Sequence, residues 1–124
     1  MRRKSPTLTE QELEIMKVVW QKGDATVRDV YETLLERRKV AYTTVMTMMK
    51  ILERKGHLKK RRRDRAYVYR PARPETVVVR SMVREFVDRV FNGSAHPLMV
   101  HLVQDRQLSE EELEELARLI KEAE

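Results

Sequence analysis

Side chains suited to binding a polyanion are concentrated between residues 42 and 69. Threonine and lysine recur at short intervals over residues 43–50, and six of the seven residues 59–65 are Lys or Arg. Hydroxyl and ammonium groups can bond base edges or phosphates, whereas clustered arginines suit phosphates or a narrow minor groove. These residue types and spacings indicate contact with double-stranded DNA.

A helix over about residues 42–55 would place the threonines and the lysine on one side. Its buried side has apolar residues at helical spacing, namely Val45, Met48, Met49 and Leu52. Gly56 can end the helix, because a residue without Cβ adopts the left-handed conformation at little cost. The predicted DNA-binding side carries Thr43, Thr44, Met46, Thr47 and Lys50, with Arg54 further along. We expect Met46 to be an exposed apolar contact for a thymine methyl group. The alternative for the threonines is a solvated helix surface with no partner.

The basic run that follows predicts a short hairpin, with strands over 58–62 and 66–70 and a turn at 63–65. Tyr67 and Tyr69 fall on the same side of the second strand, so we expect at least one of them to pack against the protein. The hairpin side chains that we expect to contact DNA are Arg61, Arg62, Arg63, Arg65 and Tyr67.

Two further helices precede this unit. Thr9-x-x-Glu12 is a capping box, in which each side chain bonds a backbone N–H group at the start of a helix. On the apolar side of that helix, Trp20 is predicted to be a core residue. Thr26 is a good cap for a second helix that ends near Arg37.

Residues 1–73 thus have the order helix-helix-helix-strand-strand, which is typical of a winged helix-turn-helix domain whose third helix reads DNA. Beyond a proline-flanked linker the pattern is helical again, over about 75–91, over 97–103, and from a capping box at Ser109 onward. We therefore predict a mainly α protein with a winged-helix DNA-binding domain and a small three-helix domain at 74–124.

The second domain has more apolar side chains than one helix face can bury. A segment of about 50 residues without disulfide or metal buries too little surface to be secure alone. We therefore infer that two copies pack together as a homodimer; the alternative is that the surplus packs onto residues 1–70 of the same chain. The predicted dimerisation residues are Val79, Met82, Val83, Phe86, Val90, Leu98, Leu102, Leu113, Leu116 and Ile120.

Charge differs sharply between the two halves. Residues 1–74 hold 20 Lys and Arg against 9 Asp and Glu, and residues 75–124 hold 6 against 11, which gives +11 and −5. A basic front half suits nucleic acid, although anionic membranes and acidic proteins are alternatives. The absence of cysteine fits a reducing cytoplasm, and no apolar run approaches the ~20 residues that span a bilayer. We expect a cytoplasmic protein with no membrane partner.

Catalytic signatures are missing. The chain has no nucleophile–base pattern and no glycine-rich phosphate loop, so we predict no enzyme activity and no cofactor. A metal site from His96, His101 and nearby carboxylates is conceivable, but no consistent ligand spacing supports it, and we predict no metal.

The whole chain resembles the BlaI/MecI/CopY family of bacterial winged-helix repressors, which includes the penicillinase repressors. The resemblance is carried by LTEQELEIMKVVW (8–20), VRDVYETL (27–34), YTTVMTMMKILERKGHL (42–58), AYVYRP (66–71) and the tail from VFNG (90–93) to LSEEELEELARLI (108–120). It implies a homodimer that binds a dyad-symmetric operator, with half-sites similar to TACA and TGTA, and blocks transcription. It also places the recognition helix at Thr43 to Lys50 and the wing at Arg61 to Tyr67.

Two departures from the family concern the inducing signal. Penicillinase repressors are cleaved at an Asn-Phe pair after a membrane sensor protease responds, and here His101-Leu102 stands at the matching place. Copper-responsive members carry a cysteine cluster, and this chain has no cysteine.

We therefore expect a transcriptional repressor. The rival hypothesis is a protein-interaction adaptor that uses the winged-helix scaffold to dock an acidic partner. The polar side of helix 42–55 next to the arginine hairpin distinguishes the two, because an adaptor would not need it.

Overall fold

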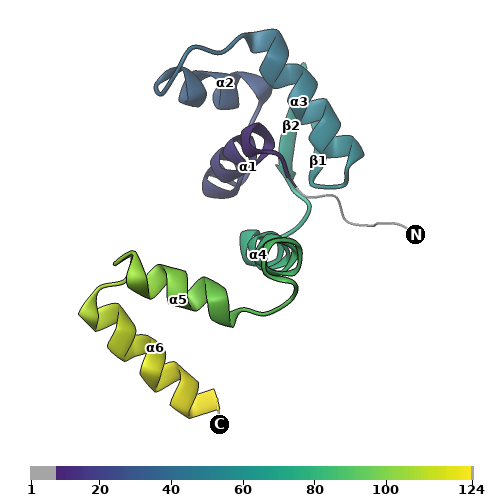
Figure 1. The fold of residues 1–124 in the computed structure, drawn as a ribbon. Helices are drawn as coiled ribbons and strands as arrows, with labels where there is room; N and C mark the ends of the chain where they lie inside the picture. Colours follow the sequence, from purple (N-terminus) through teal and green to yellow (C-terminus); the bar gives the residue numbers. More distant parts are fainter. Residues whose placement is uncertain (1–7, 124) are drawn as a thin grey trace. The chain divides into compact units, whose positions relative to one another are not determined.

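The computed structural model describes residues 8–123, so the basic start of the chain, residues 1–7, lies outside the described part together with Glu124. Within it, three helices precede an antiparallel hairpin and three helices follow (Figure 1). The elements are α1 (Glu10–Lys22), α2 (Val27–Leu35), α3 (Tyr42–Arg54), β1 (Leu58–Arg63), β2 (Ala66–Pro71), α4 (Glu75–Phe91), α5 (His96–Gln104) and α6 (Glu110–Ala123). This order confirms the predicted mainly α class with a helix-helix-helix-hairpin front half.

Contacts divide the chain into two compact units, one ending at Met82 and the other beginning at Val83. The division falls inside α4. The first turns of α4 pack with the helices and hairpin before them, since Val78 is buried in the core of the first unit and Met82 lies against it.

The helices begin at the local signals that the sequence carries. Thr9 and Glu12 form the reciprocal hydrogen bonds of a capping box at the start of α1, and Ser109 and Glu112 do the same before α6. Thr26 forms another with Asp29, a shorter side chain than the glutamate usual at this position. The second helix ends at Leu35, two residues before the predicted Arg37, and the segment continues as a turn.

The core of the first unit lies where α1, α2, α3 and the base of the hairpin meet. Its fully buried side chains include Ile15, Met16, Val18 and Val19 of α1, Val30 and Leu34 of α2, and Val45, Met49 and Leu52 of α3. Trp20 is half-buried at the edge of this core, and its indole N–H donates to the carbonyl of Arg73, 3.1 Å away. The predicted buried side of α3 is confirmed, with Met48 only partly buried.

A buried carboxylate joins α1 to the end of α3. The Nζ atom of Lys55 donates to both oxygens of Glu12 at 2.9 and 3.0 Å, and the Glu12 residue is 4% exposed. Burial alone would raise the pKa of Glu12, but the backbone hydrogen bond from Thr9 and the bond and charge of Lys55 outweigh it and hold the pKa below its usual value. The ionised carboxylate therefore stabilises the fold.

We expect Glu12→Gln to lower the free energy of unfolding by about 1 kcal/mol at pH 7, because glutamine keeps the capping box but loses the ion pair. A carboxylate whose pKa is lower in the folded state stabilises the fold fully above its unfolded pKa of about 4.3. This stabilisation is lost as pH falls through the folded-state pKa. The difference between wild type and variant should therefore be complete at pH 7 and should shrink as pH falls below about 4.3. Urea unfolding at fixed protein concentration measures this difference in the free energy of unfolding. The control is Glu32→Gln, which removes an exposed pair with Arg28 and should change stability little at any pH. A gap between wild type and Glu12→Gln that does not shrink on acidification would contradict the assignment.

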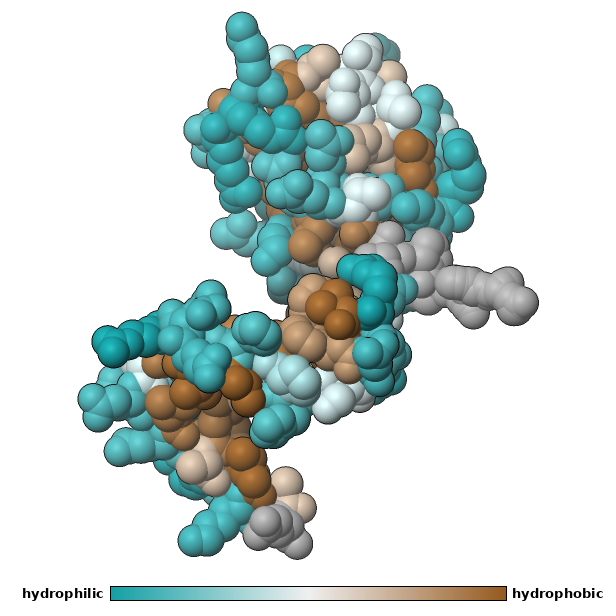
Figure 2. All heavy atoms as spheres, in the orientation of Figure 1, coloured by the Kyte–Doolittle hydropathy of each residue, from teal (hydrophilic) through white to brown (hydrophobic). Residues whose placement is uncertain are grey.

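The second unit leaves its apolar residues uncovered. No described residue from Val83 to Ala123 is buried. Figure 2 shows hydrophobic side chains gathered over α5 and α6. The large apolar side chains that stay exposed in this unit are Val83, Phe86, Val90, Met99, Val103, Leu119 and Ile120.

Among the described residues, none of the helices is both long enough and apolar enough to span a bilayer.

Candidate nucleic-acid interface

One exposed stripe of polar residues runs the length of α3. Thr43, Thr47, Lys50 and Arg54 are all exposed and follow one another at intervals of four, three and four residues, which aligns them on one side of an α-helix. The opposite side holds the buried Val45, Met49 and Leu52, so core packing fixes which way the stripe faces. Donor and cationic groups aligned in this way can reach base edges and phosphates in a major groove.

Two of the predicted contact residues lie beside this stripe. Thr44 is exposed on the flank of α3. Met46 was expected to be an exposed side chain, and the structure instead half-buries it on the flank that faces the hairpin. There Met46 lines a groove together with Tyr42 and Lys50 of α3 and with Lys60 and Tyr67 of the hairpin.

The hairpin has two chemically different faces. Its register pairs Lys60 with Tyr69, Arg62 with Tyr67 and Arg63 with Ala66, which puts Lys60, Arg62 and Tyr67 on one face together with the buried Tyr69. Arg61 and Arg63 alternate onto the other face. The turn is one residue shorter than predicted, because β1 extends to Arg63 and Asp64 adopts a left-handed conformation (φ 57°).

The ring of Tyr67 lies close to the two cations on its own face of the hairpin. The ammonium of Lys60 lies 4.5 Å from the centre of its ring and the guanidinium of Arg62 lies 5.7 Å from it. Tyr67 is 45% exposed, whereas Tyr69 is 3% exposed. The expectation that one of the two tyrosines packs is therefore confirmed, and Tyr67 is the one that remains accessible.

A groove separates α3 from the hairpin. We call it the α3–hairpin groove; its lining residues are Val27, Tyr42, Met46, Lys50, Lys60, Arg65, Ala66, Tyr67 and Tyr69. Its floor is apolar or aromatic, and its rim carries the cations of Lys50, Lys60 and Arg65. Such a groove can hold a sugar–phosphate backbone or a base methyl group against Met46 while the rim neutralises the phosphates.

Sequence reasoning missed Tyr42, Lys60 and Arg28 as members of this surface. Tyr42 packs edge-on against Tyr31, with ring centres 5.4 Å apart, and the guanidinium of Arg28 lies 5.7 Å from the Tyr42 ring. The signals were present: Tyr42, Met46 and Lys50 recur every four residues, and Lys60 alternates with Arg62 along its strand.

Backbone contacts fix the hairpin against the helices. Gly56 has φ +88° where α3 ends, which confirms its predicted role. At the other side of the unit, Ala25 and Tyr69 exchange backbone hydrogen bonds of 2.9 and 2.8 Å, so the α1–α2 linker is attached to β2. The hairpin and the helices therefore keep a defined spacing.

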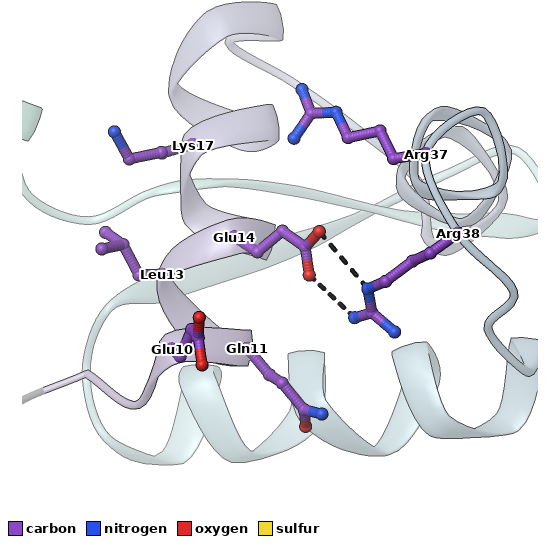
Figure 3. A pocket seen from close by; sticks show the side chains of 7 residues that line it. All are labelled: Glu10, Gln11, Leu13, Glu14, Lys17, Arg37 and Arg38. Carbon is purple, nitrogen blue, oxygen red and sulfur yellow. Dashed lines mark hydrogen bonds and ion pairs between the residues drawn. The ribbon is translucent and has the colours of Figure 1, made fainter.

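A second hollow lies between α1 and the segment that follows α2 (Figure 3). The carboxylate of Glu14 accepts from Nη2 and Nε of Arg38 at 2.7 and 3.5 Å, and this hydrogen bond and charge raise the pKa of Arg38. Lys17 of α1 and Arg37 of the segment after α2 also line the hollow. We interpret the Glu14–Arg38 pair as an anchor that holds the linker leading into α3.

The predicted dimerisation residues fall into three groups. Met82 packs against the core of the first unit, in line with the alternative considered for the apolar surplus. Leu98, Leu102, Leu113 and Leu116 are half-buried, whereas Val79, Val83, Phe86, Val90 and Ile120 are exposed. In a single chain, these exposed apolar side chains remain in contact with solvent.

The residues at the cleavage-site position lie inside α5. His101 is exposed, with its ring 6.0 Å from that of Phe91, and Leu102 is half-buried. In the described part of the chain, no three His, Cys, Asp or Glu side chains are grouped closely enough to hold a metal ion.

Comparison with known proteins places this geometry in context. A family model described as Penicillinase repressor matches residues 8–122. The Penicillinase repressor of Bacillus licheniformis is 29% identical over 120 residues, which cover 97% of this chain and 94% of that protein. Transcriptional regulator BlaI of Mycobacterium tuberculosis is 34% identical over 119 residues, which cover 94% and 85% of the two chains. The solution structure of monomeric Bacillus licheniformis BlaI in complex with the blaP half-operator has 31% identity and a TM-score of 0.52, and the match covers 60% of this chain and 92% of that one.

Proposed function

The chain belongs to the penicillinase repressor family, and from this premise we propose that it is a transcriptional repressor that binds a dyad-symmetric DNA operator as a homodimer. The observation that carries the proposal is the exposed stripe of α3 beside the α3–hairpin groove. A rigid polar helix side next to a basic, aromatic groove matches what a major groove and its flanking phosphates present.

We assign the reading of bases to the middle of α3. Thr43, Thr47 and Lys50 would reach base edges, and Met46 would contact a thymine methyl group from the wall of the groove. Because no side chain caps the first turn of α3, the N–H groups there are open to a phosphate, and Thr44 lies close enough in sequence to add its hydroxyl.

Phosphate contacts are assigned to cations beside these positions. Arg54 would extend the stripe of α3 to the backbone, and Lys60, Arg62 and Arg65 would follow the strand past the groove, with Tyr67 orienting two of them. Within residues 8–123, no ion pair engages Arg54, Arg62 or Arg65. Arg61 and Arg63, which the sequence grouped with them, already have an acidic partner.

We assign dimerisation to the segment 74–124, with the exposed apolar residues of α4 and α6 and the half-buried leucines of α5 and α6 at the interface. The support is physical: between residues 83 and 123 no residue is buried, so little burial offsets the entropy of the chain, and a second copy is the simplest cover. A homodimer also suits an inverted repeat, because each copy can meet one half-site.

The family is one of regulators, and we propose that this member has no enzymatic role and acts in the cytoplasm. A sensor protease remains the proposed inducing partner. Cleavage at His101-Leu102 would require α5 to open locally, because a protease binds its substrate extended and these residues are helical.

Titration with two duplexes of equal length tests the proposal. One carries TACA and TGTA as an inverted repeat, and the other carries the same bases in scrambled order. We expect the repeat to bind at least 10³-fold more tightly, with both affinities falling steeply as salt rises from about 50 to 200 mM. Equal, weak binding to both duplexes would favour the adaptor hypothesis instead.

A further inference from the structure

One acidic residue in the linker between α1 and α2 holds two arginines of the hairpin. The Oδ2 atom of Asp24 accepts from Nη2 of Arg61 at 3.1 Å and from Nη2 of Arg63 at 3.5 Å. Strand alternation places both arginines on the hairpin face away from the α3–hairpin groove. The three residues are far apart in sequence, so the arrangement is produced by the fold.

The position of Asp24 is set by the backbone on both sides. Gly23 ends α1 with φ +87°, and the next residue but one, Ala25, is 1% exposed and exchanges two backbone hydrogen bonds with Tyr69 of β2. The carboxylate of Asp24 is therefore presented to the hairpin by a fixed segment. A flexible surface chain that met the arginines by chance would lack these attachments.

The arginines of the hairpin consequently fall into two kinds. Arg62 and Arg65 have no acidic partner among the described residues, whereas Arg61 and Arg63 share one carboxylate. Lys60 on the groove face has a separate partner, Glu53 of α3, at 3.5 Å. A carboxylate offers an arginine the same kind of charged oxygen acceptor as a phosphate does. In charge and acceptor type, Asp24 thus gives these two side chains the kind of partner that a DNA phosphate would give them.

We infer that Asp24 withholds Arg61 and Arg63 from DNA and so limits sequence-independent binding by the hairpin. This inference rests on the proposed DNA-binding function. Asp24 is 41% exposed and the two arginines are 54% and 53% exposed, so the contact is screened by water and can open. Each arginine that reaches a phosphate must first leave the carboxylate, which weakens attraction to any duplex. On the operator, docking of α3 in the major groove sets where the hairpin lies, so we expect the two arginines to add less affinity there than on other duplexes. Asp24 would then raise the ratio of operator to non-operator binding.

The test uses the full chain with Asp24→Asn, which keeps the shape of the side chain and removes its charge. On a scrambled duplex we expect affinity to rise on the order of three- to tenfold at about 100 mM salt. The plot of log affinity against log salt should steepen by about 0.9 for each released arginine, up to roughly 1.8 per chain. Operator affinity should rise less, because phosphate contacts in that complex are already set by α3 in the major groove.

The matched control is Asp64→Asn at the tip of the same hairpin. It removes the same charge where no described ion pair involves the aspartate, and asparagine tolerates the left-handed conformation there (φ 57°). A simple effect of net charge would appear equally in both variants, whereas release of the arginines would appear only with Asp24→Asn.

A double-mutant cycle completes the test. Arg61→Gln with Arg63→Gln should change scrambled-duplex binding little in the wild type and should cancel the gain in the Asp24→Asn background. Equal effects of the two asparagine variants, or weaker DNA binding by Asp24→Asn, would overturn the inference while leaving the repressor proposal intact. If the wild type does not prefer the inverted repeat, the proposed function itself is wrong. The same titrations report this outcome independently of the Asp24→Asn result.

Discussion

Ile120→Lys will convert the protein to a monomer and lower its affinity for a full inverted-repeat operator by about 10²- to 10⁴-fold. Ile120 is 61% exposed in the single chain, so lysine costs the monomer little, and a cation near the end of α6 is favourable to that helix. In the proposed dimer both copies would bury an uncompensated charge, which costs several kcal/mol per site. Loss of the partner turns the second half-site contact into an independent binding event. Analytical ultracentrifugation at micromolar concentration and operator titration measure the two effects.

The control for this variant is Glu122→Gln. It changes the net charge by the same +1 on the polar side of α6 and should leave both the dimer and operator binding unchanged. The added positive charge can only favour DNA, so a loss of affinity in Ile120→Lys cannot come from electrostatic repulsion. If Ile120→Lys and Phe86→Lys both sediment as dimers, the exposed apolar residues of α4 and α6 are not the interface.

Local signals in the sequence located most of the fold. Capping boxes at Thr9 and Ser109 and the left-handed Gly56 depend on residues within a few positions, so the ends of α1, α6 and α3 could be predicted from spacing alone. The exposed stripe of α3 was predictable for the same reason, because the helical period fixes which side of α3 opposes its apolar residues.

Contacts between distant residues were not predictable in this way. Asp24 lies 37 positions from Arg61, and Glu12 lies 43 positions from Lys55; each pair meets because the helices and hairpin pack. The sequence therefore grouped four hairpin arginines together, whereas the strand register puts Arg62 on one face and Arg61 and Arg63 on the other, and Arg65 lies in the turn. Met46 was expected to be exposed because helical spacing puts it on the edge of the stripe, whereas the structure half-buries it where it lines the α3–hairpin groove.

Lys50→Ala will weaken operator binding by about 1–3 kcal/mol, that is roughly 5- to 150-fold, and affect a scrambled duplex far less. Lys50 belongs both to the exposed stripe of α3 and to the rim of the α3–hairpin groove, so its ammonium can reach a guanine acceptor in the major groove. A base contact is lost only on the correct sequence, whereas a phosphate contact is lost on every sequence. Titration of an operator series with one base pair changed at a time should show relaxed preference at a single position.

Lys17→Ala is the appropriate comparison for this variant. Lys17 is an exposed lysine of α1 that lines the hollow beside the Glu14–Arg38 pair, so its removal takes away the same charge from a surface outside the α3–hairpin groove. Any general loss of electrostatic attraction would appear in both variants and can be subtracted. The loss of affinity that remains for Lys50→Ala is then due to the place of this lysine on α3. If that remainder is the same on operator and scrambled DNA, Lys50 contacts only phosphate, and the reading of bases must be assigned to the threonines of the stripe.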